Sequence, residues 1–256
     1  MRFALELFGA AFVASILGSM VGLGGGFVLT PILRLLLGFS PAAVAGTSLV
    51  LIVANSAGGA LTYLLHRRVH LKIGLLIALG GLPSGIIGAI ISVHISARIF
   101  DALLALLLVA VAVDLIWNAE RRLAGRPEPQ RLQKIKGMSY RGALALGFVV
   151  GIFLSLFGLG GGIVLIPAFL YFSELPVHAI SATSQFAIFL TSPPALITHV
   201  LQHDVVGRDV IPLVLGGLLG GPIGARISLR LRSPQLLIVV AIALIIAAIT
   251  LIWRQL

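Results

Sequence analysis

Hydrophobic positions in this chain are grouped into long uninterrupted blocks that recur from one end to the other. Each block has at least about 18 residues, which is long enough to cross the roughly 30 Å hydrocarbon core of a bilayer as a helix. The blocks fill the sequence and leave no room for a soluble domain. The pattern therefore predicts an all-α integral membrane protein.

The blocks form eight segments in two groups of four, separated by a single long polar stretch. They span 3–37, 42–65, 72–94 and 97–117, then 140–173, 178–201, 209–230 and 234–253. The predicted organisation is a first transmembrane repeat at 1–117, a flexible cytoplasmic linker at 118–139 and a second transmembrane repeat at 140–256.

The two groups are copies of one unit. Gly22 recurs as Gly158, 136 positions later, and the same spacing then holds without a gap. The matched pairs include Gly24 with Gly160, Gly25 with Gly161, Gly26 with Gly162, Pro31 with Pro167, Thr47 with Thr183, and Ser48 with Ser184. Transporters are commonly built from such repeats, with the binding site between them.

The first segment of each copy is too long for one straight crossing and contains three consecutive glycines. Glycine costs about 1 kcal/mol in a helix interior relative to alanine, so we expect a helix broken at this point in each copy. A broken helix inside a membrane exposes backbone groups that only protein or a water-filled cavity can cover.

Eight full crossings would put both termini and the linker on one side and make the two copies parallel. On that arrangement 13 of the 18 Lys and Arg residues lie on the side of the termini. Because cytoplasmic loops are enriched in Lys and Arg, the sequence predicts both termini in the cytoplasm. The exceptions are Arg34, Arg98, Arg226, Arg230 and Arg232.

Composition supports a membrane protein, since 59% of the residues are hydrophobic and 10% are charged. An ordinary soluble domain is about 25% charged. The net charge of +10 therefore reflects topology, and we expect no nucleic-acid partner. The chain has no cysteine, which excludes disulfides and thiolate metal sites.

The glycine breaks are the first candidate site. A half-helix that begins at a break points unpaired N–H groups and the positive end of its dipole at the break, which suits an anion. The alternative is that the glycines only allow two helices to approach closely. Because the motif occurs twice, we favour a substrate site at Gly22, Gly24, Gly25, Gly26, Gly158, Gly160, Gly161 and Gly162.

A polar stripe on the second segment of each copy is the second candidate. Its residues are spaced by seven, about two helical turns, and therefore share one face. We expect substrate contacts from Thr47, Ser48, Asn55, Thr183, Ser184, Gln185 and Thr191. The alternative is that these side chains join helices through hydrogen bonds of about 0.6 kcal/mol each.

Other motifs argue against enzymatic chemistry. Phe27 and Ile163 follow the glycine runs where a phosphate-binding loop needs Lys and Ser or Thr, so no nucleotide cofactor is expected. The four-residue spacings of His66 with His70 and of His199 with His203 lack further ligands, so no metal is expected. Arg34 either pairs with an anion or extends to the membrane surface.

These glycine motifs, the Thr-Ser pair after each and the four-plus-four layout resemble the sulfite exporter TauE/SafE family of bacterial membrane permeases. The resemblance implies a secondary transporter in the cytoplasmic (inner) membrane that exports sulfite or a related sulfur oxyanion or organosulfonate. It implies a small anionic substrate, the lipid bilayer and a coupling ion, proton or sodium, as partners. The alternatives are a non-transporting scaffold or assembly factor and an intramembrane enzyme.

Overall fold

The computed structural model describes residues 2–123, 139–173 and 175–231 and isolated positions between 235 and 249, with only the backbone at 119–123. This described part is helical and contains no strand. The linker expected at 118–139 and the segment expected at 234–253 lie largely outside it. Its helices are α1 (Arg2–Val21), α2 (Gly26–Leu35), α3 (Pro41–Leu65), α4 (Leu71–Ser92), α5 (Ala97–Leu123), α6 (Tyr140–Phe157), α7 (Gly162–Phe172), α8 (Val177–Leu201), the short 3₁₀ helix η1 (Gly207–Asp209) and α9 (Val210–Ser228).

Glycines end the first helix of each copy, as the repeat predicts. Gly22 and Gly158 follow α1 and α6 with φ of 85° and 62°, a left-handed conformation that residues with a side chain adopt reluctantly. Short helices follow both breaks: α2 has 10 residues and α7 has 11, which is about half the length needed to cross a bilayer. The predicted breaks are therefore confirmed.

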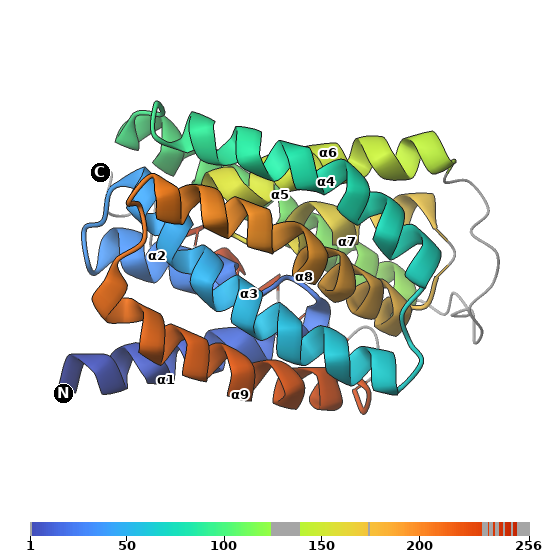
Figure 1. Cartoon of the computed structure of the whole chain (residues 1–256). Helices are drawn as coiled ribbons and strands as arrows, with labels where there is room; N and C mark the ends of the chain where they lie inside the picture. The colour runs from blue at the N-terminus through green and yellow to red at the C-terminus, as the bar shows by residue number, and fades with distance from the viewer. Residues whose placement is uncertain are drawn as a thin grey trace.

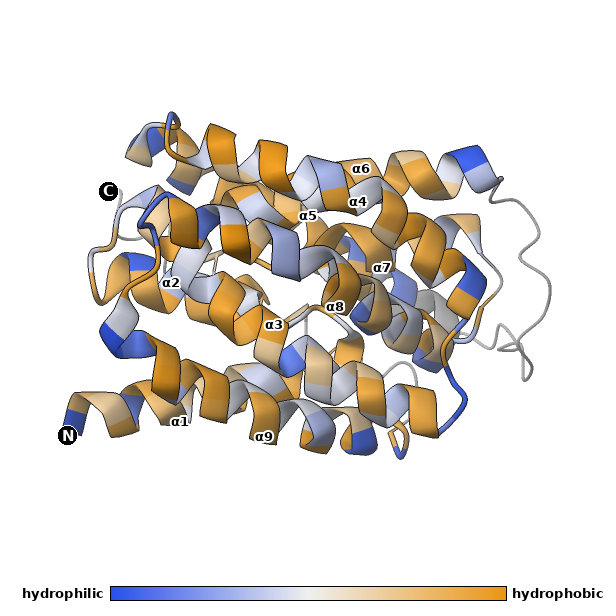
Figure 2. Cartoon of the chain, viewed as in Figure 1, coloured by the Kyte–Doolittle hydropathy of each residue, from blue (hydrophilic) through white to orange (hydrophobic). Residues whose placement is uncertain are grey.

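The long helices lie side by side in a bundle, with α1 and α9 along one edge, α4 and α6 along the opposite edge, and α3 and α8 between them (Figure 1). Seven described helices are long and apolar enough to cross a membrane. Apolar residues dominate along these helices, and the polar positions lie mostly inward or at helix ends (Figure 2).

Contacts along α9 establish the direction of the first helix. Gly216, near the start of α9, approaches Ala11 of α1. Two turns later, Gly224 approaches Ile16. The two helices therefore run in the same direction.

Helix α3 also runs parallel to α9. Gly217 approaches Ala54 of α3, and Pro222 lies against Gly58 one turn further along both helices. Helices α1 and α3 are thus parallel to each other, so the chain between them must return to the end from which α1 started. Helix α2 is the returning arm, and the first broken segment turns back inside the bundle instead of crossing it.

The second copy repeats this arrangement around α4. Gly147 of α6 approaches Ile77, and Gly88 further along α4 approaches Ile152, so α4 and α6 are parallel. Helix α8 is parallel to α4 as well, because Gly85 lies against Ala195 and Gly74 against Phe186. Helix α7 is therefore also a returning arm.

The sequence left open whether the broken segments cross fully or turn back. Two expectations that assumed full crossings are wrong: parallel copies, and an N-terminus on the same side as the linker. The broken segments do not cross, so the first copy has three crossings and ends opposite to where it began. The N-terminus and the helix ends at Leu123 and Tyr140 that flank the linker accordingly lie at opposite ends of the bundle (Figure 1). The two copies are antiparallel, an inverted repeat, and both termini cannot share a side with the linker.

The third long segment of each copy, α4 or α9, packs against the other copy through glycines. Gly81 and Gly85 of α4 lie against Thr191 and Ala195 of α8, while Gly217 of α9 lies against Ala54 of α3. Small residues let these helices approach closely, as is common in membranes. Each contact joins one copy to the other, so the two units interlock.

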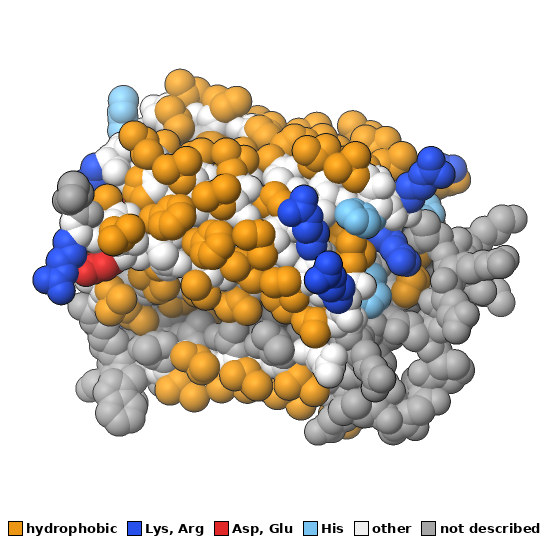
Figure 3. Space-filling model, turned by 90° about the horizontal axis from the view of Figure 1, so that it is seen from below, with side chains coloured by type: hydrophobic (Ala, Val, Ile, Leu, Met, Phe, Trp, Pro, Cys, Tyr) orange, Lys and Arg blue, Asp and Glu red, His pale blue; other side chains and the backbone are white. Residues whose placement is uncertain are grey.

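The outer surface fits a lipid environment. Large apolar side chains such as Leu61, Leu106 and Ile211 are more than half exposed. On the face drawn in Figure 3, apolar side chains cover most of the surface, and charged side chains gather toward the two ends.

Candidate functional site

The two glycine breaks meet inside the bundle. A side-chain carbon placed on Gly24 would lie 3.5 Å from the Cα of Gly160. A carbon on Gly26 would overlap the carbonyl oxygen of Gly158, and one on Gly162 would overlap that of Gly22. Residues 21–27 and 154–163 are all buried. The breaks can pack this closely because they have no side chains.

Unpaired backbone donors gather at this meeting point. Among the described residues, no partner accepts a hydrogen bond from the N–H groups of Gly24, Gly25, Gly26 and Phe27 in the first break, or of Leu159, Gly160, Gly161 and Gly162 in the second. Buried N–H groups are paired in more than 90% of cases, because leaving them unpaired is costly. Eight unpaired donors at one place indicate a ligand or ordered water.

The conformation of the breaks suits a negative ligand. Gly24, Gly25 and Gly160 have φ of 87°, 82° and 86°. Successive N–H groups in mixed left- and right-handed conformations form concave anion-binding nests. Helices α2 and α7 also begin here, so the positive ends of two helix dipoles lie at the breaks.

Hydroxyl groups donate hydrogen bonds to carbonyl oxygens of the breaks. Ser184 of α8 donates to the Gly22 carbonyl at 2.7 Å, and Thr30 of α2 donates to the Gly158 carbonyl at 2.9 Å. Thr30 also lies 3.1 Å from the Ser48 hydroxyl. Each break is thus tied to the opposite copy through the carbonyl group of its first glycine.

The structure gives Thr47 and Thr183 a different partner from the one expected. Thr47 accepts a hydrogen bond from the backbone N–H of Val206 at 3.2 Å, and Thr183 accepts one from His70 at 3.0 Å. These positions match in the repeat, so both threonines hold the loop before α9 or α4. Their contact with substrate stays a prediction.

A buried polar cluster lies beside the first break. Ser19 donates to Oδ1 of Asn55 at 2.7 Å and accepts from Nε2 of Gln185 at 2.9 Å. Nδ2 of Asn55, Oε1 of Gln185 and the hydroxyl of Ser15 are buried without partners among the described residues. Ser15 adjoins Gly25, whose added Cβ would lie 3.4 Å from its Cα. The cluster therefore offers both donors and an acceptor near the break.

The second copy lacks this cluster. Asn55 corresponds to Thr191, whose hydroxyl donates to Ala187 of its own helix at 2.8 Å, and Gln185 corresponds to Leu49. The two halves of the site therefore differ chemically although the breaks match.

Sequence reasoning missed Thr30, Ser15 and Ser19. Ser19 has a visible signal, because it recurs as Ser155 at the repeat spacing, just before each break. Thr30 corresponds to Ile166 and Ser15 to Gly151, so the repeat offers no signal for them.

Arg34 takes neither of the roles considered for it. Its guanidinium binds the carboxylate of Asp101 through two hydrogen bonds of 2.7 and 2.8 Å, and also donates to the carbonyl of Phe39. Such a bidentate pair fixes the end of α2 against α5. Among the described residues, no group of three or more potential metal ligands occurs.

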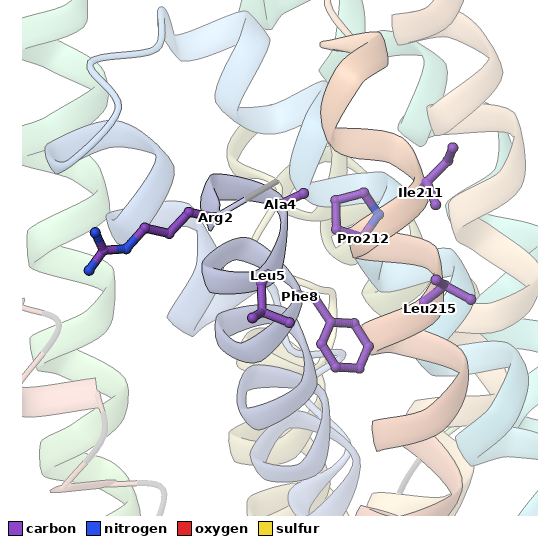
Figure 4. A pocket seen from close by; sticks show the side chains of 7 residues that line it. All are labelled: Arg2, Ala4, Leu5, Phe8, Ile211, Pro212 and Leu215. Carbon is purple, nitrogen blue, oxygen red and sulfur yellow. The ribbon is translucent and has the colours of Figure 1, made fainter.

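A groove on the outer surface lies away from the breaks. It has a volume of about 590 Å³ between the first turns of α1 and α9 (Figure 4). Its walls are Arg2, Ala4, Leu5, Phe8, Ile211, Pro212 and Leu215. Because the walls are almost wholly apolar and face outward, a lipid chain fits this groove better than a small anion does.

Comparison with known families decides the class of this site. The family described as "Sulfite exporter TauE/SafE" matches residues 7–251, nearly the whole chain. The chain belongs to the sulfite exporter TauE/SafE family. It is accordingly a membrane transporter with transmembrane helices, and it acts on a small substrate within a lipid bilayer.

Curated relatives of this TauE/SafE protein carry names of the same class. The "Probable membrane transporter protein YunE" of Bacillus subtilis is 28% identical, with 94% of each chain covered. The "Probable membrane transporter protein y4hK" of Sinorhizobium fredii is 28% identical, with 98% of each chain covered. These names are consistent with transport rather than enzymatic activity.

Proposed function

We propose that this chain exports a small anion, sulfite or a related sulfur oxyanion or organosulfonate, by alternating access around the two glycine breaks. One observation carries the proposal: eight buried backbone N–H groups lie at the breaks without a partner in the described chain. The description of the family supports sulfite as the first substrate to test.

An oxyanion satisfies these donors better than any other small solute. Its oxygens accept several hydrogen bonds at once, and hydrogen bonds to a charged acceptor contribute about 1.5–3 kcal/mol each. The positive ends of α2 and α7 add to the attraction. Asp101 and Asp209 lie near the starts of α5 and α9, and Asp101 is paired with Arg34, so neither carboxylate belongs to the breaks.

The side chains around the breaks divide between support and contact. Ser184, Ser48 and Thr30 fix the carbonyl groups, so they hold the breaks in shape. Asn55 and Ser15 keep an unpaired donor each, and these would complete the shell around the anion. We assign support of the breaks to Ser184, Ser48 and Thr30, and substrate selection to Asn55 and Ser15.

The inverted repeat supports alternating access. Two antiparallel units around one central site can exchange conformations, so that the site opens first to one side and then to the other. Broken helices that end at the midplane permit such a change, because no continuous helix blocks both routes.

We propose that the linker end of the bundle faces the cytoplasm and that the N-terminus lies outside. With the antiparallel units, the basic residues Arg226 and Arg230 at the end of α9 join those of the linker end. That end then has Arg67, Arg68, Lys72, Arg121, Arg122, Arg141, Arg226 and Arg230, and the linker adds Arg126, Arg131, Lys134 and Lys136. The other end of the described chain has Arg2, Arg34, Arg98 and Arg208, so the bias favours a cytoplasmic linker.

Sulfite flux in proteoliposomes tests the proposed site. We expect Gly161→Ala and Gly25→Leu to lower flux by at least about tenfold, since each disturbs donors worth 1.5–3 kcal/mol. Gly161 has an ordinary helical φ of −63°, so a loss of flux in Gly161→Ala cannot come from backbone strain. An added carbon there would instead press on Val150.

Gly9→Ala is the matched control, because nothing lies within 4 Å of the added carbon. Its flux should equal that of the unchanged protein. Sulfite should also raise the unfolding temperature of the unchanged protein and not of Gly161→Ala, because only the former binds it. Unchanged flux in both folded break variants would exclude the breaks as the site.

A further inference from the structure

A buried histidine and an aspartate form a hydrogen-bonded pair at the end of α8. His199 is fully buried, and its Nδ1 lies 3.0 Å from Oδ2 of Asp204. Its Nε2 lies 3.0 Å from the backbone carbonyl oxygen of Ser155, in the last turn of α6. Both ring nitrogens therefore face oxygen acceptors.

Both contacts of His199 can be hydrogen bonds at once only if the pair holds an extra proton. The carbonyl oxygen of Ser155 only accepts, so its 3.0 Å contact is a hydrogen bond if Nε2 of His199 carries hydrogen, and the Ser155 hydroxyl lies farther from Nε2, at 3.4 Å. A neutral imidazole has one N–H group, and Nδ1 would then present a lone pair to an ionised carboxylate. The contact at 3.0 Å is a hydrogen bond only if His199 is an imidazolium or Asp204 is a carboxylic acid. In either form, the pair has bound one exchangeable proton.

The matching place in the first copy has no such proton. Tyr63 stands 136 positions before His199, and its hydroxyl donates to the carbonyl of Ser19 at 2.7 Å. Ser19 in turn matches Ser155, so the hydrogen bond to the helix end occurs in both copies. Arg68 occupies the position of Asp204. Both copies therefore have the hydrogen bond to the helix end, but only the second copy has a histidine and an aspartate there.

Two neighbouring helices contribute uncharged groups to the pair, and the titratable His203 directly precedes Asp204 in the chain. Helix α3 contributes Gly46, whose backbone lies against both His199 and Asp204, and α6 contributes Ser155. Within the described part of the chain, His199 and Asp204 form ion pairs with each other and with no other residue. The Asp204 side chain is 13% exposed, at the end of the bundle near the N-terminus. Water at that end can therefore exchange a proton with the pair.

We infer that His199 and Asp204 form the proton site that couples proton movement to anion movement. The inference rests on the transport proposed above. Loss of the proton leaves one N–H group on the ring, so His199 keeps the bond to Asp204 or the bond to Ser155 but not both, which alters how α8 holds Ser155, three residues before Gly158. Proton affinity then depends on the state of the second break, which coupling requires. With the N-terminus outside, a proton enters from outside as the anion leaves, so the transport is an antiport.

Two sulfite measurements in proteoliposomes separate coupling from binding. Exchange of labelled sulfite at equal concentration and equal pH on both sides reports the anion site alone. Accumulation of sulfite driven by an imposed pH difference, with the membrane potential clamped, reports coupling. Protein-free vesicles give the background of sulfite that crosses the lipid by itself.

His199→Tyr copies the arrangement of Tyr63, so it retains the bond to Ser155 and removes the titrating ring. Asp204→Asn removes the carboxylate. We expect both variants to lose pH-driven accumulation by at least about tenfold and to keep exchange within about threefold, since coupling and binding are separate free energies. Thr198→Val is the control, because Thr198 adjoins His199 but bonds within its own helix at 2.9 Å. It should keep both activities.

Each outcome decides one of the two proposals. If the unchanged protein exchanges no sulfite, the proposed function fails. If it exchanges sulfite but a pH difference does not drive accumulation, the proton site fails and the transport function stands. The same holds if a pH difference still drives sulfite accumulation by the folded variants. Should His199→Tyr not fold, Asp204→Asn carries the test.

Discussion

Thr30 shows how one hydroxyl joins the two copies. It donates to the carbonyl of Gly158, lies beside Ser48 and is fully buried. The repeat offers no equivalent, since Ile166 stands at the matching position. Its bond therefore holds the second break from one side, while Ser184 holds the first break from the other.

We expect Thr30→Val to destabilise the protein. Valine has the same shape, but it leaves the buried Gly158 carbonyl without this donor, which costs about 1–3 kcal/mol. The midpoint of thermal unfolding in detergent should fall by several degrees. Thr62→Val is the control, because Thr62 donates within its own helix to Gly58. An equal midpoint for both variants would mean that the bond to the break contributes nothing specific.

At the scale of helices, the seam between α4 and α6 depends on glycines that face backbone. Gly80 approaches the Leu144 carbonyl, and Gly147 approaches the Ile77 carbonyl. The equivalent seam joins α1 and α9 in the other half. Both seams join helices of different copies, so they also set the relative position of the two units.

Gly147→Ala and Gly9→Ala should change stability in opposite directions. Both place alanine in a helix, where it is favoured over glycine by about 1 kcal/mol. Gly9 has free space, so its variant should unfold at the same or a higher temperature. At Gly147 the new carbon would overlap the Ile77 carbonyl, and this overlap outweighs the propensity. A stabilised Gly147→Ala variant would show that the seam can open at little cost.

The hydrophobic pattern predicts these helices closely. The segments expected at 42–65 and 178–201 are α3 (Pro41–Leu65) and α8 (Val177–Leu201), and the breaks fall at the predicted glycines. The direction of α2 and α7 could not be predicted, because periodicity and hydropathy measure what a helix buries and not where it points. Segment 3–37 has the composition of a crossing, and only its contacts with α9 reveal the turn.

The same limit applies to the site. The repeat pointed to the glycines, Ser48 and Ser184, because each stands at a matched position, and their contact with substrate stays a prediction. It could not assign Thr47 and Thr183 to loops, since a buried threonine has the same pattern whether it binds backbone or solute. It also gave no reason to pair His199 with Asp204, which requires the turn after α8 to fold back.

At the scale of the whole molecule, inversion of the two units resolves the charge pattern. If the copies are parallel, Arg226 and Arg230 lie on the side with few Lys and Arg residues. In the antiparallel arrangement α9 ends beside the loop that contains Arg67 and Arg68, so both arginines lie on the side rich in Lys and Arg. One change of topology thus removes Arg226 and Arg230 from the exceptions and places the N-terminus at the end of the bundle opposite the linker.

Single cysteines can test this topology directly, because the natural chain has none. Gly207→Cys places a thiol on an exposed residue at the N-terminal end, where an added Cβ has nothing within 4 Å. Arg68→Cys places one on an exposed residue at the linker end. A maleimide that cannot cross membranes should label the first in intact cells and the second only after the cells are opened. Labelling of both in intact cells, or of Arg68→Cys alone, would be incompatible with a cytoplasmic linker, whereas the antiparallel units themselves require that the two positions never share a side.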